Sequence, residues 1–114
     1  SWGIADTTLH RPIRFALGPD DPPHTATGTP DDFLALLARL PEPVRERMAR
    51  CTDTAMLPRL LDVNAYAADL GTAPPAWSVA HKPGAVSGVR NDVGWVRRGD
   101  HALALAVFTQ GCPD

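Results

Sequence analysis

Residues 89–109 read VRNDVGWVRRGDHALALAVFT, and this stretch decides the fold class. Residues 89–97 and 101–109 have the composition of strands, and Arg98-Gly99-Asp100 between them is typical of a tight hairpin turn. Residues 102–108 are apolar at every position, which favours a central strand with both faces covered. Together with a strand expected at residues 77–80, this stretch predicts an antiparallel meander over residues 77–110.

The residues upstream of the meander have the periodicity of helices. Thr29 suits the N-cap of a helix, and Pro30 suits its first turn. The apolar residues 33, 36, 37 and 40 form one stripe along this helix. A second helix is expected over residues 42–51, with Val44 and Met48 facing inward.

The rest of the chain completes the expected organisation. Helical character is expected to return over residues 59–69, so residues 30–71 form a helical segment. Residues 1–30 contain many turn formers and no clear period. The expected fold class is therefore α/β in its α+β form, with helices packed on an antiparallel sheet in a single segment of 114 residues.

The charge balance excludes several classes of function. The chain has 11 Lys and Arg against 13 Asp and Glu, with a net charge of −2. A strong nucleic-acid or anionic-membrane surface would need clustered positive charge. The longest apolar run is too short to span a bilayer, and the first residues do not resemble a signal peptide. We expect no nucleic-acid partner and no membrane span.

The His and Cys residues imply no metal and no cofactor. The four His have no metal-ligand spacing and are expected to be hydrogen-bonded or solvated. Cys51 and Cys112 are too few for a disulfide framework. Two unrelated thiols are the favoured interpretation, and a single bridge between them is the alternative.

Lys82 is the only lysine in the chain, although there are ten arginines. It lies in His81-Lys82-Pro83-Gly84 and is followed by Arg90-Asn91-Asp92. This pattern resembles the third active-site element of the class A β-lactamases and related penicillin-recognising serine hydrolases, a Lys-Thr-Gly triplet on a strand followed by a strand that begins Asn-Asp. Residues 8–30 resemble the family's omega loop, residues 29–37 the helix after it, and residues 104–109 its next strand, so nearly the whole chain is covered in the right order.

The resemblance implies a role for each matching residue, because in this family the strand lies along the active-site cleft. Lys82 is expected to place a cation near the nucleophile and the substrate carboxylate. Gly84 is expected to let the substrate approach the backbone, and the amide of Ala85 to donate to the oxyanion. Arg90 is expected to pair with the substrate carboxylate, which its planar fork suits. For Lys82 and for Arg90, a solvated charge on a strand is the alternative.

The departures from the family pattern are also informative. Pro83 replaces the Thr of the triplet, so a hydroxyl and a backbone N–H are lost and substrate binding is expected to differ. The position of the family's deacylating Glu falls near Ile13, and that of its companion Asn near Leu17. Residues 8–30 contain no Glu, so a water activated by that Glu is not a route for deacylation here. Asp20 and Asp21 lie in an expected turn and are expected to be solvated.

The family nucleophile, a Ser in a Ser-x-x-Lys motif, is absent from these residues, because Val79 lies three positions before the only lysine. We therefore expect the chain to be the later portion of a larger domain, with a complementary segment or chain that carries the Ser-x-x-Lys motif. The 114 residues alone are expected to expose an apolar patch, and so to self-associate or to need that complement.

Two functions are compatible with a chain that has the Lys-x-Gly strand but lacks the Ser-x-x-Lys motif. The chain is either part of a serine hydrolase or acyl transferase that acts on a small amide, lactam or ester through an acyl-enzyme, or a catalytically inactive ligand-binding or interaction module. Loss of the loop Glu disfavours an efficient β-lactamase. The family implies an extracytoplasmic location. Catalysis by an N-terminal Ser1 or by Cys112, and adhesion through Arg98-Gly99-Asp100, are disfavoured.

Overall fold

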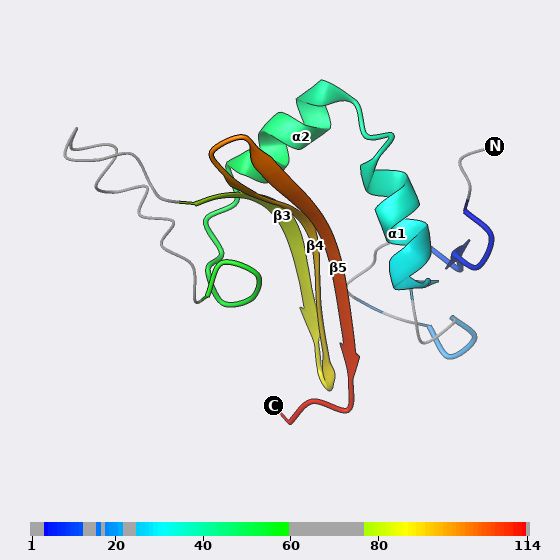
Figure 1. The fold of residues 1–114 in the computed structure, drawn as a ribbon. Coiled ribbons are helices and arrows are strands. Elements are labelled where there is room, and N and C mark those ends of the chain that lie inside the picture. Colours follow the sequence, from blue (N-terminus) through cyan, green and yellow to red (C-terminus); the bar gives the residue numbers. More distant parts are fainter. Residues whose placement is uncertain (1–3, 13–15, 17, 22–24, 60–76, 114) are drawn as a thin grey trace.

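The computed structural model describes residues 4–12, 16, 18–21, 25–59 and 77–113. It has an α+β fold, as expected, in which two helices and a three-stranded antiparallel sheet form the main body (Figure 1). The elements in chain order are β1 (Thr8–Leu9), β2 (Ala26–Thr27), α1 (Pro30–Leu37), α2 (Glu42–Ala49), β3 (Ser78–Val86), β4 (Val89–Arg98) and β5 (His101–Gln110). The helical character expected over residues 59–69 falls almost entirely outside the described residues.

The sheet has the order β3-β4-β5, and each neighbouring pair is joined by a two-residue turn. The turn between β4 and β5 contains Gly99 with a φ of +57°, and the turn between β3 and β4 contains Gly88 with a φ of +72°. Glycine adopts these left-handed conformations without steric cost. The hairpin at Arg98-Gly99-Asp100 is thus confirmed, whereas the first strand is longer than expected and continues to Val86.

Both helices cover the same face of the sheet. The buried residues Leu37 of α1, Met48 of α2 and Val93 of β4 form one core cluster. Phe33 of α1 packs against Phe108 of β5 with the ring centroids 5.0 Å apart. Thr29 caps α1 as expected, since its hydroxyl accepts the N–H of Asp32. Met48 is buried as expected, and Val44, one turn before it on the same side of α2, lines a groove between the helices and the sheet but stays 39% exposed.

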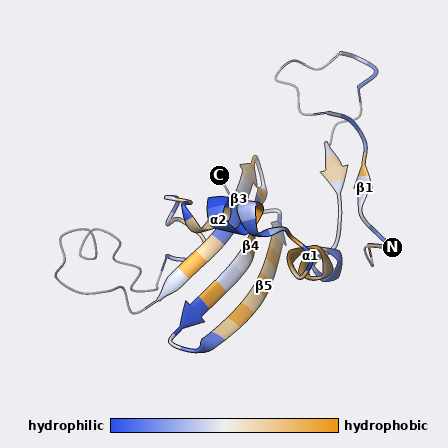
Figure 2. Ribbon diagram, turned by 90° about the horizontal axis from the view of Figure 1, so that it is seen from above, coloured by the Kyte–Doolittle hydropathy of each residue, from blue (hydrophilic) through white to orange (hydrophobic). Residues whose placement is uncertain are grey.

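The expectation that residues 102–108 form a central strand with both faces covered is wrong for the described part of the chain. β5 is an edge strand of the described sheet, and its colouring in Figure 2 is hydrophobic along most of its length. Phe108 and Ala106 pack towards the helices. Leu103 and Val107 point to the other face, where they are 59% and 45% exposed. The strand is apolar on both faces, but α1 and α2 supply apolar cover to only one of them.

The two ends of the omega-like loop meet next to α1. β1 and β2 pair antiparallel, with Thr8 opposite Thr27, on the far side of α1 from the sheet. Asp32, which is buried, accepts three hydrogen bonds from the start of the chain: from the N–H of Ala5 at 3.0 Å, the N–H of Asp6 at 2.8 Å and the hydroxyl of Thr7 at 2.7 Å. This carboxylate therefore fastens residues 5–7 to the first turn of α1.

The hydrogen bonds to Asp32 make the stability of the chain depend on pH. The Thr7 hydroxyl and then the Ala5 N–H hold the pKa of Asp32 below its ordinary value of 3.8. Because the folded chain favours the carboxylate, this stabilisation is present above pH 3.8 and is lost as the pH falls through the lowered pKa. We expect Asp32→Asn to lower the Tm by about 5 °C at pH 7, and by less near pH 3, as measured by circular dichroism.

Asp31→Asn is the matched control, because Asp31 lies in the same first turn of α1 and is exposed. It is expected to change the Tm by much less than Asp32→Asn at pH 7. Equal losses for the two variants would show that the general preference of a helix N-terminus for acidic residues, and not the hydrogen bonds to residues 5–7, accounts for the effect.

Candidate functional site

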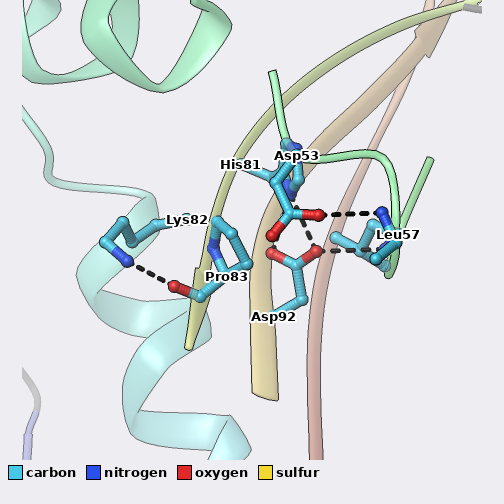
Figure 3. A network of polar contacts seen from close by, with 7 residues as sticks. Asp53, Leu57, His81, Lys82, Pro83 and Asp92 are labelled. Carbon is cyan, nitrogen blue, oxygen red and sulfur yellow. Dashed lines mark hydrogen bonds and ion pairs between the residues drawn. The ribbon is translucent and has the colours of Figure 1, made fainter. Parts of the chain in front are cut away.

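Lys82 lies on the helix-covered face of β3, opposite Val93 of β4. Its side chain is exposed, and its ammonium group donates to the carbonyl oxygen of Pro83 (Figure 3). Lys82 lies at an apolar groove of about 460 Å³ between the two helices and the sheet. The groove is lined by Phe33, Leu36, Leu37, Leu40, Val44, Arg47, Met48, Cys51, His81, Lys82 and Val93.

The backbone of Ala85 faces the open edge of β3. Arg90, which pairs with Ala85 in the register, donates its N–H to the hydroxyl of Thr109 on β5, and its carbonyl accepts from the same hydroxyl. Both backbone groups of Arg90 therefore point away from β3. In an antiparallel ladder the partner of such a residue points its N–H and C=O outward. The N–H of Ala85 is thus directed away from the sheet.

The same alternation explains why β3 tolerates a proline. Pro83 is two residues before Ala85, so its backbone nitrogen also faces the open edge, where no bond across the sheet is lost. Gly84 lies between them, and no heavy atom lies within 4 Å of the position that a Cβ would take there. Among the described residues the space beside Gly84 is therefore open, while Pro83 has no N–H and its carbonyl accepts from the ammonium group of Lys82.

The structure does not bring Arg90 to the face that carries Lys82. The register places Arg90 on the opposite face of the sheet, because it pairs with Ala85. Its Nη1 donates to the carbonyl oxygens of Val86 at 2.6 Å and Val89 at 2.8 Å, both next to the turn between β3 and β4. In this arrangement the guanidinium binds its own hairpin. Of the candidate residues, Lys82, Pro83, Gly84 and Ala85 therefore share one strand, and Arg90 lies apart from Lys82.

A buried contact between His81 and Asp92, next to Lys82, was missed by the sequence reasoning. His81 and Asp92 are 1% and 3% exposed, and Nδ1 of His81 lies 2.8 Å from Oδ2 and 3.0 Å from Oδ1 of Asp92 (Figure 3). The N–H of Leu57, in the segment after α2, donates to Oδ2 of Asp92 at 3.0 Å. The two residues are diagonal neighbours on one face, a relation visible only once the register is known.

The ring of His81 has one unsatisfied nitrogen and little room. Within the described ranges, its buried Nε2 has no hydrogen-bond partner. Gly94 lies opposite His81, and a Cβ built on Gly94 would come within 2.7 Å of the His81 Cα and Cβ and 2.2 Å of the Ala80 carbonyl oxygen. Position 94 therefore has to be glycine for β3 and β4 to pack as they do.

The remaining candidate residues fall into three groups. The positions matched to the loop Glu and Asn, Ile13 and Leu17, lie outside the described residues. Asp20 is exposed, and Asp21 accepts the N–H of Gly18 at 2.8 Å within a turn. Cys51 and Cys112 are both free thiols, as the favoured interpretation expected.

The described residues were also compared with the requirements of a metal site and of a membrane-spanning helix. In the described ranges no group of three or more His, Cys, Asp or Glu side chains gathers closely enough to hold a metal ion. None of the helices in the described part of the chain has the length and apolar character needed to cross a membrane.

Comparison with known proteins gives one match. The family model described as the beta-lactamase enzyme family matches residues 1–114. No curated protein and no solved structure matches the chain.

Proposed function

The chain belongs to the β-lactamase enzyme family. We propose that it supplies the strand that lines one side of the active site of a serine hydrolase or acyl transferase, with Lys82, Pro83, Gly84 and Ala85; this set of residues is called the reactive wall below. The substrate is a small amide, lactam or ester. The nucleophilic Ser lies in a Ser-x-x-Lys motif outside residues 1–114, on a complementary segment of the same polypeptide or on a second chain. As in the rest of the family, an extracytoplasmic location is expected.

The observation that carries this proposal is the arrangement of Lys82 and Ala85 on one edge strand. Lys82 presents a cation at the groove, and the N–H of Ala85 points out of the sheet a few residues further along. A donor fixed in the backbone and a nearby cation are the groups that stabilise the negative charge formed when a Ser oxygen attacks a carbonyl.

The roles in the reaction follow from that arrangement. The Ser oxygen forms a bond to the substrate carbonyl, the proton leaves the hydroxyl, and the amide or ester bond breaks as the leaving group takes up a proton. Lys82 lowers the cost of the developing charge and assists the movement of the proton. The N–H of Ala85 donates to the oxyanion. Water or an acceptor nucleophile then breaks the acyl-enzyme ester by a route that does not use the loop Glu.

The groove beside Lys82 supports a location for the complementary segment. Its lining is apolar apart from a few side chains such as Arg47 and Lys82. An apolar helix that carries the nucleophile at one end would bury this lining and bring its Ser to Lys82. Burial of such a lining is favourable by roughly 25 cal/mol for each Å².

The second candidate function is an inactive ligand-binding or interaction module. Pro83 and the loop without Glu favour it, because both remove groups that the family uses. The guanidinium of Arg90 is also bound to its own hairpin. This module would use the open edge of β3 to bind and would carry out no chemistry.

The exposed apolar surfaces lead to a prediction about the 114 residues on their own. Leu103 and Val107 on the uncovered face of β5, together with the groove, are expected to make the isolated polypeptide self-associate at micromolar concentration. Sedimentation velocity measures this directly. A monodisperse monomer with the same sheet would contradict the need for a complement and favour the module.

The function itself is tested by covalent labelling. The protein purified from its natural source is treated with a β-lactam or fluorophosphonate probe, and the intact masses are measured. We expect the probe on a Ser of a Ser-x-x-Lys motif, in the same polypeptide as residues 1–114 or in one that copurifies with it.

A further inference from the structure

The geometry points to His81 as the positioning residue of this site: its imidazole, held by Asp92, fixes Lys82 against the groove and keeps the Ala85 N–H on the open edge. This inference rests on the proposed function, because it gives His81 a task only if Lys82 and Ala85 form the reactive wall. Nothing in the residue types alone assigns His81 this task.

The position of Lys82 needs such a support, because within the described part of the chain β3 has a sheet neighbour on one side only. The ladder to β4 reaches β3 at alternate residues, which include Lys82 and Gly84. Pro83 between them donates no hydrogen bond. At the adjacent residue, the side chain of His81 supplies a contact of 2.8 Å to Oδ2 of Asp92 on β4, in addition to the ladder.

The same carboxylate joins β3 to the segment that follows α2, on the face of the sheet opposite the groove. Asp92 accepts from His81 on β3 and from the N–H of Leu57, which belongs to the segment that follows α2. α2 forms one wall of the groove, and Lys82 on β3 lies at the other. Because both connections end on one buried carboxylate, a change at His81 alters the placement of Lys82 and of the segment after α2 together.

Among the residues that the structure describes, few charged or titratable groups surround the pair. Asp92 is the charged group in contact with His81, and Lys82 is adjacent but points to the opposite face of β3. Asp53, from the segment after α2, lies near the pair in Figure 3 and accepts the N–H of Ala55 at 2.8 Å. The carboxylate of Asp92 faces Nδ1 and can only accept a hydrogen bond there. A neutral imidazole of His81 therefore carries its proton on Nδ1 and donates it to Asp92.

The test follows Lys82 by NMR, without substrate, in the protein that includes residues 1–114 and the Ser-x-x-Lys segment. Reductive methylation with ¹³C formaldehyde labels the lysine side chains, and the signal of Lys82 is identified by its loss in Lys82→Arg. The exchange rates of the Lys82 and Gly84 amides are measured in parallel. We compare His81→Leu, which removes the donor, with His81→Asn, whose amide nitrogen lies at the same bond separation from the backbone as Nδ1. His101→Leu is the control, because His101 is exposed at the start of β5.

We expect His81→Leu to speed up exchange at Lys82 and Gly84 by about tenfold or more, and to move the methylated Lys82 signal towards that of an unfolded chain. The Val96 amide, which bonds to β5, serves as the internal reference and should change much less. His81→Asn should keep the exchange rates of the Lys82 and Gly84 amides within about threefold of those of the original protein, and the methylated Lys82 signal near its original position. This comparison tests the role of the His81 donor even if His81→Leu does not fold.

Three results would overturn the inference. The first is an unchanged Lys82 signal and unchanged exchange in His81→Leu. The second is equal acceleration at Lys82 and Val96, which would describe a general loss of stability. The third is a folded His81→Asn in which Lys82 is as unprotected as in His81→Leu. Because no readout needs a nucleophile, positioning can hold while probe labelling fails, and the failure of one proposal is distinguishable from the failure of the other.

Discussion

Gly94→Ala is expected to destabilise the fold by about 3 kcal/mol or more. The added Cβ would lie 2.2 Å from the carbonyl oxygen of Ala80 and 2.7 Å from the Cα of His81. Both are backbone atoms of the neighbouring strand, so no side-chain rotation relieves the contact. β3 would have to move away from β4 at the position where His81 reaches Asp92.

Gly84→Ala is the matched control for this prediction. Gly84 lies on β3 within the same pair of strands, and its added Cβ would meet no heavy atom within 4 Å. Urea unfolding followed by tryptophan fluorescence measures both variants. A Gly94→Ala protein as stable as Gly84→Ala would mean that β3 and β4 are not packed as described. The position of His81 opposite Gly94 would then have to be revised.

Lys82→Met is expected to reduce the rate of covalent labelling by β-lactam probes by at least about 100-fold. Methionine keeps an unbranched side chain of similar length but removes the cation at the groove. The measurement is single-turnover labelling, followed by intact mass, of the protein that includes the Ser-x-x-Lys segment. The fold should be preserved, because Lys82 is exposed and its ammonium contacts only the adjacent carbonyl of Pro83 among the hydrogen bonds described.

Arg97→Met is the control for the loss of a positive charge. Arg97 is exposed on β4, at the opposite end of the strand from the β3–β4 turn, and does not line the groove beside Lys82. Its labelling rate is expected to stay within about twofold of the original. Equal losses for the two variants would assign the effect to overall charge and remove Lys82 from the reactive wall.

Local sequence signals predicted the parts of the fold that depend on neighbouring residues. Thr29 and Pro30 marked the start of α1, because capping and a preset φ act within one turn. The glycine of Arg98-Gly99-Asp100 marked the hairpin for the same kind of reason. The strand expected at residues 77–80 ended before Lys82, and the turn between β3 and β4 was not predicted. The resemblance to the Lys-Thr-Gly strand, and not a local signal, is what placed Lys82, Gly84 and Ala85 on a strand.

The parts that the sequence did not predict depend on contacts between distant residues. The apolar composition of residues 102–108 predicted a covered central strand, but composition does not say which elements supply the cover, and β5 is an edge of the described sheet. Arg90 matched a carboxylate-binding position, yet carbonyl oxygens of its own hairpin are nearer. The pairing of His81 with Asp92 needed the register and the position of Leu57.

The proposed role of this chain is to supply Lys82 and the Ala85 N–H to an acyl-enzyme whose nucleophilic Ser lies outside residues 1–114. The most direct measurement is the intact mass of the protein from its natural source after treatment with a β-lactam or fluorophosphonate probe, with peptide mapping of the labelled residue. We expect one probe per protein on a Ser of a Ser-x-x-Lys motif, in the polypeptide that contains residues 1–114 or in one bound to it. Material that carries no probe under conditions that label a known serine hydrolase would rule out this role of Lys82 and Ala85, and the binding-module function would take its place.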